Sequence, residues 1–145
     1  MDEIEVTINE QARAQFFGEL FQKHQDLESC LINDFKKYKS DGVVPSYFGR
    51  DVAYVQPYSA LKACLMHIHL KIPPDKFPSD RVQYYRTHKT DDSENDICLV
   101  YTQGLIEDHR YSIIAILHPD AHVKARDYKV MDALAQLAQD FRDNN

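Results

Sequence analysis

Two apolar runs in the last third of the chain, separated by a short turn, most constrain how it can fold. Ile97–Gln103 (ICLVYTQ) and His109–Leu117 (HRYSIIAIL) have the length and the β-branched and aromatic content of strands. Only Gly104–Asp108 lies between them. Because a parallel crossover needs about a dozen residues or more, so short a connection predicts antiparallel pairing. We therefore expect an antiparallel sheet in the core of the fold.

Helical periodicity lies on both sides of this pair of strands. Apolar residues recur every three to four positions over residues 10–41 and again over residues 121–142. In the first segment Gly18 and the polar run 23–26 are expected to divide the helix into two, and Gly42 is a natural residue at its C-terminal end. The pattern predicts helices before and after the main strands.

Two further strands and two loops complete the expected order. We expect strands at Glu3–Ile8 and Ala60–Leu70, a structured loop over residues 43–59, and an excursion loop over residues 71–95. Strands joined by short turns, with helices before and after them, favour an α+β fold in which an antiparallel sheet has helices packed on one face. The chain of 145 residues is expected to be a single domain.

Several classes of protein are disfavoured by simple features. No window approaches the roughly 18 unbroken apolar residues of a membrane span, and the acidic N-terminus lacks the apolar region of a secretory signal. The three cysteines are an odd number without CxxC spacing, which argues against a disulfide framework and a cysteine-based zinc site. We expect three buried thiols in a cytoplasmic protein.

The charge distribution is uneven. The net charge of −6 argues against nucleic-acid binding, since phosphate contacts need Lys and Arg. Residues 46–90, however, carry seven Lys or Arg against three Asp or Glu, a local net charge of +4. A bound polyanion responds to the charges within about 8–10 Å, so this basic segment matters more than the total. Charge alone leaves nucleic-acid binding and chance unevenness equally open.

Histidines are the residues whose pattern most suggests chemistry. His67 and His69 are two positions apart in an expected strand and should share a face. We predict that one face of the sheet gathers them with His118, Tyr101 and Gln103. Three residues just beyond the ends of strands are expected at the rim of that face: Arg86, His122 and Arg126.

Three interpretations of these histidines compete. They can be structural imidazoles bonded to the backbone, or His67 and His69 can join His118 and His122 in a metal site, although no carboxylate is placed with them. They can also perform acid–base chemistry on RNA. Cleavage through the 2′-hydroxyl needs a base, an acid for the leaving 5′-oxygen, and a cation for the charge on phosphorus. Histidine serves as base or acid near neutral pH, and arginine binds phosphate oxygens.

From Asp34 onward the chain resembles the YafO toxin family. The similarity rests on ordered segments at family-like spacing, none of them specific alone: DFKKYKSDGVVPSYFGRD (34–51), HIHL (67–70), PDKFP (74–78), QYYRT (83–87), LVYTQG (99–104), IIAILHPDAHVKARD (113–127), and a final helix with Met131. The resemblance implies a single RelE-like domain over residues 1–145. Residues 1–33 would form an extended N-terminal strand and helix, and residues 34–145 the family-matching region.

The resemblance also implies an activity and partners. Such proteins are type II toxins, ribosome-dependent endoribonucleases that cleave mRNA in the ribosomal A site and inhibit translation. The expected partners are a cognate antitoxin of the YafN kind, the ribosome and mRNA, and the expected chemistry uses no metal or other cofactor. The ribosome holds the RNA in place, a contribution that reaches about 7–11 kcal/mol in favourable intramolecular reactions. The toxin then needs to supply only proton transfer and charge stabilisation.

Roles for individual residues are hypotheses. His67 or His69 would be the base or acid, Arg86 would clamp the scissile phosphate, and His122 and Arg126 would flank it. The RNA-binding candidates are Arg50, Tyr101, Gln103 and His118.

One charged pair and one aromatic pair also have a structural interpretation that does not involve RNA. Arg50 and Asp51 are as well explained by a structural ion pair. Tyr84 and Tyr85 are better explained by core packing than by base stacking.

The rival hypothesis is a non-catalytic RelE-fold module that binds an antitoxin, another protein or the ribosome. The acidic net charge is its best support. Residues 10–33 exceed what a minimal family member needs, and they could lengthen the helical layer, mediate dimerisation or hold an antitoxin.

Overall fold

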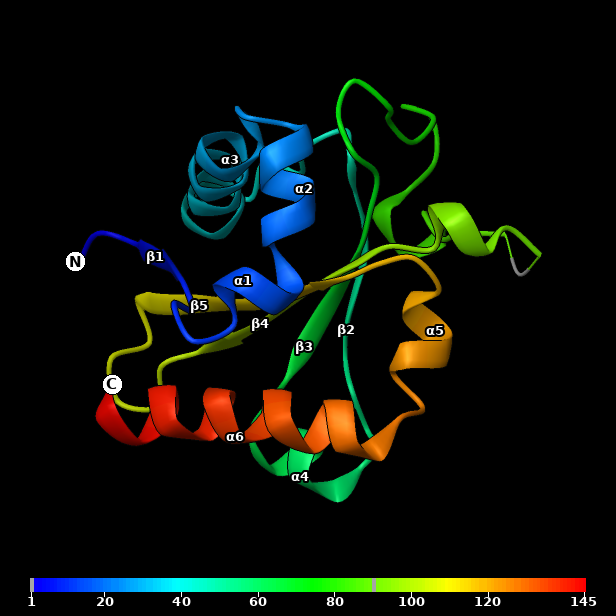
Figure 1. Cartoon of the computed structure of the whole chain (residues 1–145). Helices are drawn as coiled ribbons and strands as arrows, with labels where there is room; N and C mark the ends of the chain where they lie inside the picture. Colours follow the sequence, from blue (N-terminus) through cyan, green and yellow to red (C-terminus); the bar gives the residue numbers. More distant parts are fainter. Residues whose placement is uncertain (1, 90) are drawn as a thin grey trace.

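The computed structural model describes residues 2–89 and 91–145, which form a five-stranded sheet with helices around it (Figure 1). The strands are β1 (Glu5–Ile8), β2 (Phe48–Ala53), β3 (Met66–Leu70), β4 (Cys98–Gln103) and β5 (Arg110–Leu117). Their order is β1-β5-β4-β3-β2, and every pair is antiparallel except β1 with β5. The predicted antiparallel pairing across the turn at 104–108 and the α+β class are confirmed.

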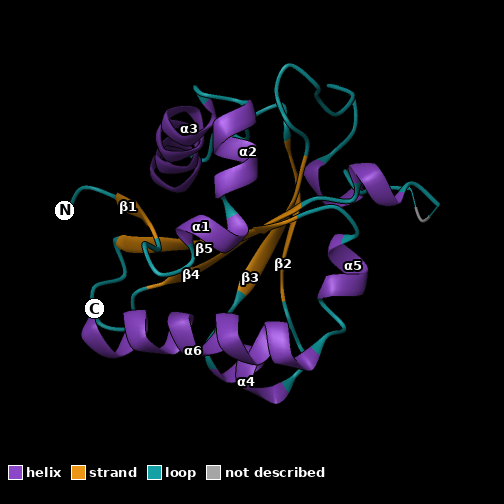
Figure 2. Cartoon of the chain, viewed as in Figure 1, coloured by secondary structure: helices purple, strands orange, loops and turns teal. Residues whose placement is uncertain are grey.

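The helices lie on both faces of the sheet. One face is covered by α1 (Arg13–Phe16), α2 (Gly18–Lys23) and α3 (Leu27–Asp41), and the other by α4 (Tyr58–Lys62) and α6 (Tyr128–Asn144), with the short α5 (Ala121–Lys124) beside the sheet (Figure 2). The excursion loop contains two 3₁₀ turns, η1 (Gln83–Tyr85) and η2 (Ser93–Asn95). The arrangement is consistent with a RelE-like fold, but helices on a single face were expected and two faces are covered.

Two hydrophobic cores explain the double coverage. Phe35 of α3 packs with Leu99 and Ile113 on one face, whereas Leu134 of α6 packs with Val100 and Ile114 on the other. Ile114 and Ala115 are neighbours that both belong to the second core, and this break in alternation coincides with a register shift in the β4–β5 ladder, where Val100 pairs with Ala115 but the next residue of β4 pairs with Ile113. A bulge of this kind breaks strict alternation and supplies apolar side chains to both faces.

The segment from 43 to 70 differs most from expectation. The predicted loop over 43–59 contains strand β2, and the predicted strand over 60–70 begins with helix α4 and only then becomes β3. Strand β2 carries few apolar side chains because it is an edge strand, and its backbone pairing with β3 leaves no mark in side-chain periodicity. By contrast, Gly42 ends α3 in the left-handed conformation (φ 72°), as predicted.

Two other expectations concern the cysteines and membrane-spanning segments. All three cysteines are free, as predicted, but Cys30 and Cys64 are exposed and only Cys98 is buried, so the expectation of three buried thiols was wrong for two of them. Among the described residues, no helix combines the length and apolarity needed to cross a membrane.

Gly49 of β2 marks the point where the excursion loop crosses the sheet. The backbone N–H of Arg50 donates to the carbonyl of Arg86 at 2.9 Å. A Cβ on Gly49 would overlap that same carbonyl oxygen and lie 3.0 Å from the ring of Phe77. The loop therefore approaches β2 as closely as it does only because position 49 has no side chain.

We expect Gly49→Ala to lower the free energy of unfolding by about 3 kcal/mol, because the added methyl group pushes the loop from the strand. Urea unfolding measures the change. Gly18→Ala is the control, since its nearest neighbour, the Arg13 carbonyl oxygen, would be 3.8 Å from the new Cβ and alanine favours helix. Equal stability of Gly49→Ala and the wild type would show that the loop does not dock as described.

Candidate active site

Four imidazoles meet where β3 faces the excursion loop and α5. His67 and His69 come from β3, His88 from the loop, and His122 from α5. The ring of His69 lies 6.0 Å from that of His67, 5.3 Å from that of His88 and 5.5 Å from that of His122, measured between centroids. The prediction that the two β3 histidines share a face is confirmed, and the fold adds two more imidazoles from distant segments.

His122 forms a histidine–carboxylate pair with Asp96. Its Nδ1 lies 2.9 and 2.8 Å from the two carboxylate oxygens, and its backbone N–H donates to Oδ2 at 2.9 Å. The Asp96 side chain is only 8% exposed, while that of His122 is 57% exposed. Because a carboxylate only accepts, Nδ1 carries the proton in this pair and Nε2 of the neutral ring keeps its lone pair. The pair therefore presents a proton acceptor on an accessible ring.

The two β3 histidines are held in the neutral form. Burial and, to a smaller extent, the neighbouring His88 lower the pKa of His69 to about 3; burial and the neighbouring His122 lower the pKa of His67 to about 4. His67 also stacks on Tyr54 at 3.9 Å. Within the described residues, Nδ1 of each ring is buried without a hydrogen-bond partner. Groups with such low pKa values are weak bases and are not protonated at neutral pH, so they are poor choices for proton transfer.

His88 is oriented through one of its ring nitrogens. Its Nε2 lies 3.0 Å from the carbonyl oxygen of Ile97, so this nitrogen carries the proton and Nδ1 is left as the acceptor. Burial lowers the pKa of His88, partly opposed by that hydrogen bond and by Asp96. His88 is thus oriented by backbone but remains able to exchange a proton.

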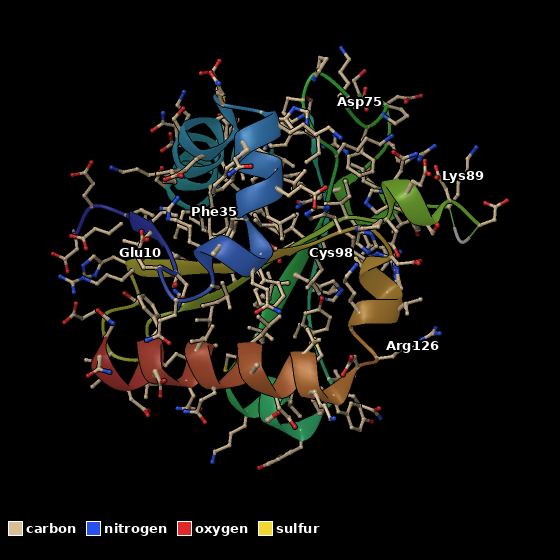
Figure 3. The ribbon with its side chains drawn as sticks, viewed as in Figure 1. Glu10, Phe35, Asp75, Lys89, Cys98 and Arg126 are labelled. Atoms are coloured by element: carbon tan, nitrogen blue, oxygen red, sulfur yellow. The ribbon has the colours of Figure 1, made fainter. Side chains whose placement is uncertain are left out.

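A cavity of about 380 Å³ joins these groups to positive charge. It is lined by His69, His88, Asp96 and His122, together with the cations Arg50, Lys89 and Arg126. Figure 3 shows Lys89 and Arg126 on the same side of the molecule, above and below the segment that contains α5. Asp92 and Asp120 also line the cavity, so its three basic groups are balanced by three acidic ones.

Arg86 is not in this cavity. Its Nε donates to the carbonyl of Arg81 at 3.0 Å, and its guanidinium NH1 donates to the carbonyl of Phe48 at 3.2 Å. With Nε and one NH₂ group bound to backbone carbonyls outside the cavity, Arg86 is not placed to clamp a phosphate at the histidines. We replace the hypothesis that Arg86 clamps the scissile phosphate by a role in holding η1 against β2.

Tyr101 lies on the opposite face from the histidines. It pairs with Met66, not with His67, and its buried hydroxyl lies 2.7 Å from a carboxylate oxygen of Asp51 and 3.0 Å from the ammonium of Lys39. The expectation that Tyr101 shares a face with His67 and His69 was therefore wrong. Burial and the Asp51 charge raise the pKa of Tyr101 far above its usual value, so the hydroxyl stays protonated.

Asp51 is also not the ion-pair partner of Arg50. Neighbouring residues of β2 point to opposite faces, so Arg50 reaches the histidine cavity while Asp51 accepts hydrogen bonds from Tyr38 and Tyr101 and lies 3.6 Å from Lys39. The structural ion pair offered as an alternative for Arg50 is excluded, and Arg50 stays an RNA-binding candidate.

Gln103 and His118 also lie outside the histidine cavity. Gln103 donates to the carbonyl of Asp108 at 2.6 Å at the far end of β4, in a separate cavity that it shares with Lys39 and Tyr101. Burial lowers the pKa of His118, and the charges that act on it are those of Glu19, Lys124 and Lys23, none of which lines the histidine cavity. The predicted gathering of Gln103 and His118 with the β3 histidines is therefore wrong, since neither residue lines the cavity at His69. In the described residues, no three His, Cys, Asp or Glu side chains are arranged to hold a metal ion.

Sequence reasoning missed His88 and Asp96. His88 lies in the polar segment 71–95 and Asp96 directly follows it, and no periodicity there predicts the direction of a side chain. One signal was present: Asp96 closes an acidic run directly before a buried strand, where a carboxylate is costly to bury without a partner. Such a residue at a strand entrance indicates a functional or structural partner elsewhere in the chain.

The fold and the cavity define a small α+β protein whose site is suited to proton transfer next to an anion. The family model described as "Toxin YafO, type II toxin-antitoxin system" matches residues 36–143, a range that holds every residue of the cavity. The chain is also 36% identical over 116 residues to the mRNA interferase toxin YafO of Escherichia coli (strain K12), covering 78% of this chain and 83% of that protein. No solved structure matches. The chain belongs to the YafO family of type II toxin–antitoxin toxins.

Proposed function

We propose that this protein is an endoribonuclease that cleaves mRNA on the translating ribosome and is neutralised by a cognate antitoxin. The observation that carries the proposal is the His122–Asp96 pair, whose free imidazole nitrogen shares a cavity with two arginines. Family membership and the name of the E. coli relative support the same activity.

His122 is the general base in this mechanism. Its Nε2 takes the proton from the 2′-hydroxyl, and the 2′-oxygen then attacks phosphorus. The bond to the 5′-oxygen breaks, leaving a 2′,3′-cyclic phosphate and a 5′-hydroxyl. Asp96 stabilises the imidazolium that forms, because a buried carboxylate at 2.8 Å favours the charged ring.

Arg50 and Arg126 bind the scissile phosphate. Both line the cavity, and neither guanidinium forms an ion pair within the described residues. They are therefore free to stabilise the extra negative charge that develops on the phosphate oxygens in the transition state.

His88 is the general acid for the leaving 5′-oxygen. Burial lowers its pKa. An anionic phosphate between the two arginines and the ring favours the protonated imidazole and moves that pKa back toward neutral. The proton that His88 donates to the 5′-oxygen balances the one that His122 removes, so the step needs no co-reactant.

The charges explain why the reaction would depend on a ribosome. A cavity with balanced charge, in a chain of net charge −6, attracts free RNA weakly. Positioning of the mRNA in the ribosomal A site supplies what the toxin's own binding surface does not. The remaining partner is an antitoxin of the YafN kind, and the compartment is the cytoplasm, where both mRNA and ribosomes are found.

Induction of the toxin alone in a bacterial host tests the proposal. We expect growth arrest, together with new mRNA 5′ ends confined to translated regions, measured by mapping 5′ ends across the transcriptome. Co-expression of the antitoxin encoded beside the toxin gene should restore growth. Equal cleavage of naked RNA would contradict ribosome dependence, and growth without any cleavage would favour the non-catalytic module.

A further inference from the structure

Two exposed tyrosines lie beside the candidate active site. Tyr84 and Tyr85, in the 3₁₀ turn η1, are 58% and 64% exposed, and their rings meet edge to face at 5.4 Å. The expectation that they pack in the core was wrong. Large aromatic side chains left in water next to a polar cavity need a reason beyond folding.

The turn that carries them is firmly attached to β2. Gln83 donates from its side-chain amide to the carbonyl of Gly49 at 3.0 Å and to the hydroxyl of Tyr38 at 2.9 Å. Arg86 donates to the carbonyls of Phe48 and Arg81 and accepts from the backbone N–H of Arg50. Both residues that flank the tyrosines are thus bonded to the body of the protein, and the turn holds the aromatic rings in fixed positions.

Arg50 connects the tyrosines to the cavity. Its guanidinium carbon lies 4.1 Å from the centroid of the Tyr84 ring, and its Nε donates to the Tyr84 carbonyl at 2.6 Å. The same side chain lines the histidine cavity. One face of the guanidinium therefore covers Tyr84, which leaves its other face and its NH₂ edges for a ligand.

We propose that Arg50 and Tyr84, with Tyr85 beside them, form a stacking subsite for an unpaired nucleobase next to the scissile phosphate. The base stacks on the free face of Arg50, or on the exposed tyrosine rings, while the NH₂ edge of Arg50 contacts the phosphate. Single-stranded RNA is commonly bound in this way, because every base has a face that stacks on aromatic rings and guanidinium planes. The subsite would thus fix which phosphate enters the cavity.

A second cavity extends the path of the bound RNA. This cavity of about 460 Å³ shares Thr87, His88, Lys89 and Asp92 with the histidine cavity, and its further charged lining residues are Lys71, Arg81 and Asp75. Four of the seven basic residues between 46 and 90 line one or both cavities. The phosphate next to the scissile one would lie in this second cavity, and the stacked base would lie at Arg50.

The inference rests on the proposed function, so its test separates binding from cleavage. The probe is a short 2′-O-methyl RNA containing 2-aminopurine, which has no free 2′-hydroxyl and is not cleaved. Stacking quenches 2-aminopurine fluorescence, so titration with the toxin gives a Kd. We expect Tyr84→Ala to weaken binding about 10-fold and Tyr84→Phe to retain it. Arg50→Lys, which keeps the charge but loses the planar face, should weaken it similarly.

Tyr58→Ala is the matched control, because Tyr58 is 74% exposed on α4 and lines neither cavity. It should bind like the wild type. Unchanged binding by Tyr84→Ala, or no quenching by the wild type, would overturn the stacking subsite even if the toxin cleaves mRNA. Quenching without cleavage or toxicity would keep the subsite and refute the nuclease.

Discussion

His122→Ala is expected to lower the rate of mRNA cleavage by about 10²–10⁴-fold, the usual contribution of a positioned general base. Among the four clustered imidazoles, His122 is the one whose ring is paired with a buried carboxylate. That pairing leaves Nε2 of its exposed ring as the proton acceptor. The His122 side chain is more than half exposed, so its removal should leave the fold intact. Primer extension on a reporter mRNA in a translation extract measures the rate, and circular dichroism reports folding.

Asp96→Asn sharpens this prediction. The amide oxygen of asparagine can still accept from the backbone N–H of His122, but an amide NH₂ facing Nδ1 favours the ring tautomer with its proton on Nε2. We therefore expect a comparable loss of activity in a folded protein. His24→Ala is the control, because His24 lies at the end of α2 and lines a different cavity. Full activity of both His122→Ala and Asp96→Asn would remove this pair from the mechanism.

The second large effect is loss of stability in mild acid. His69 is 4% exposed, and burial together with His88 lowers its pKa from 6.5 to about 3. Below pH 6.5 the unfolded chain binds a proton at His69 that the folded chain does not bind. The free energy of unfolding therefore rises with pH through this range. The contribution of the neutral His69 is complete above pH 6.5 and is lost as the pH falls toward 3. His67, with its pKa lowered to about 4, acts in the same direction.

His69 alone should cost about 2 kcal/mol between pH 6.5 and pH 5, at about 1.4 kcal/mol per pH unit. Urea unfolding at a series of pH values measures the slope. His69→Leu cannot titrate, so its slope should be shallower by about one proton, whatever its stability at pH 7. An unchanged slope in His69→Leu would mean that His69 is protonated in the folded protein, contrary to its buried environment.

The local pattern predicted some parts of the fold and site well. The short turn at 104–108 correctly indicated antiparallel β4 and β5, and the two-residue spacing of His67 and His69 correctly placed them on one face. These features depend on chain length and strand geometry within a few residues. Strand β2 was missed because its pairing is made by backbone groups that carry no side-chain signal.

The site itself required contacts between distant segments. Asp96 and His122 are 26 residues apart in the sequence. Because β5 runs antiparallel to β4, α5, which follows the end of β5, lies beside the start of β4, and this brings the two residues together. The face on which Tyr101 lies was decided by its pairing with Met66 in the neighbouring strand, which sequence spacing within β4 does not define. A one-residue shift in register would have placed it with the histidines.

The sequence by itself determined the α+β class, the family, and the presence of imidazole and guanidinium groups near strand ends. Only the tertiary structure decided which of those groups meet: it brought His88, Asp96 and His122 to His69 and left Tyr101, Gln103 and His118 elsewhere. The reason is physical. Periodicity records which face of an element is buried, whereas a site is made by register, loop docking and burial, which arise only when separate elements pack together.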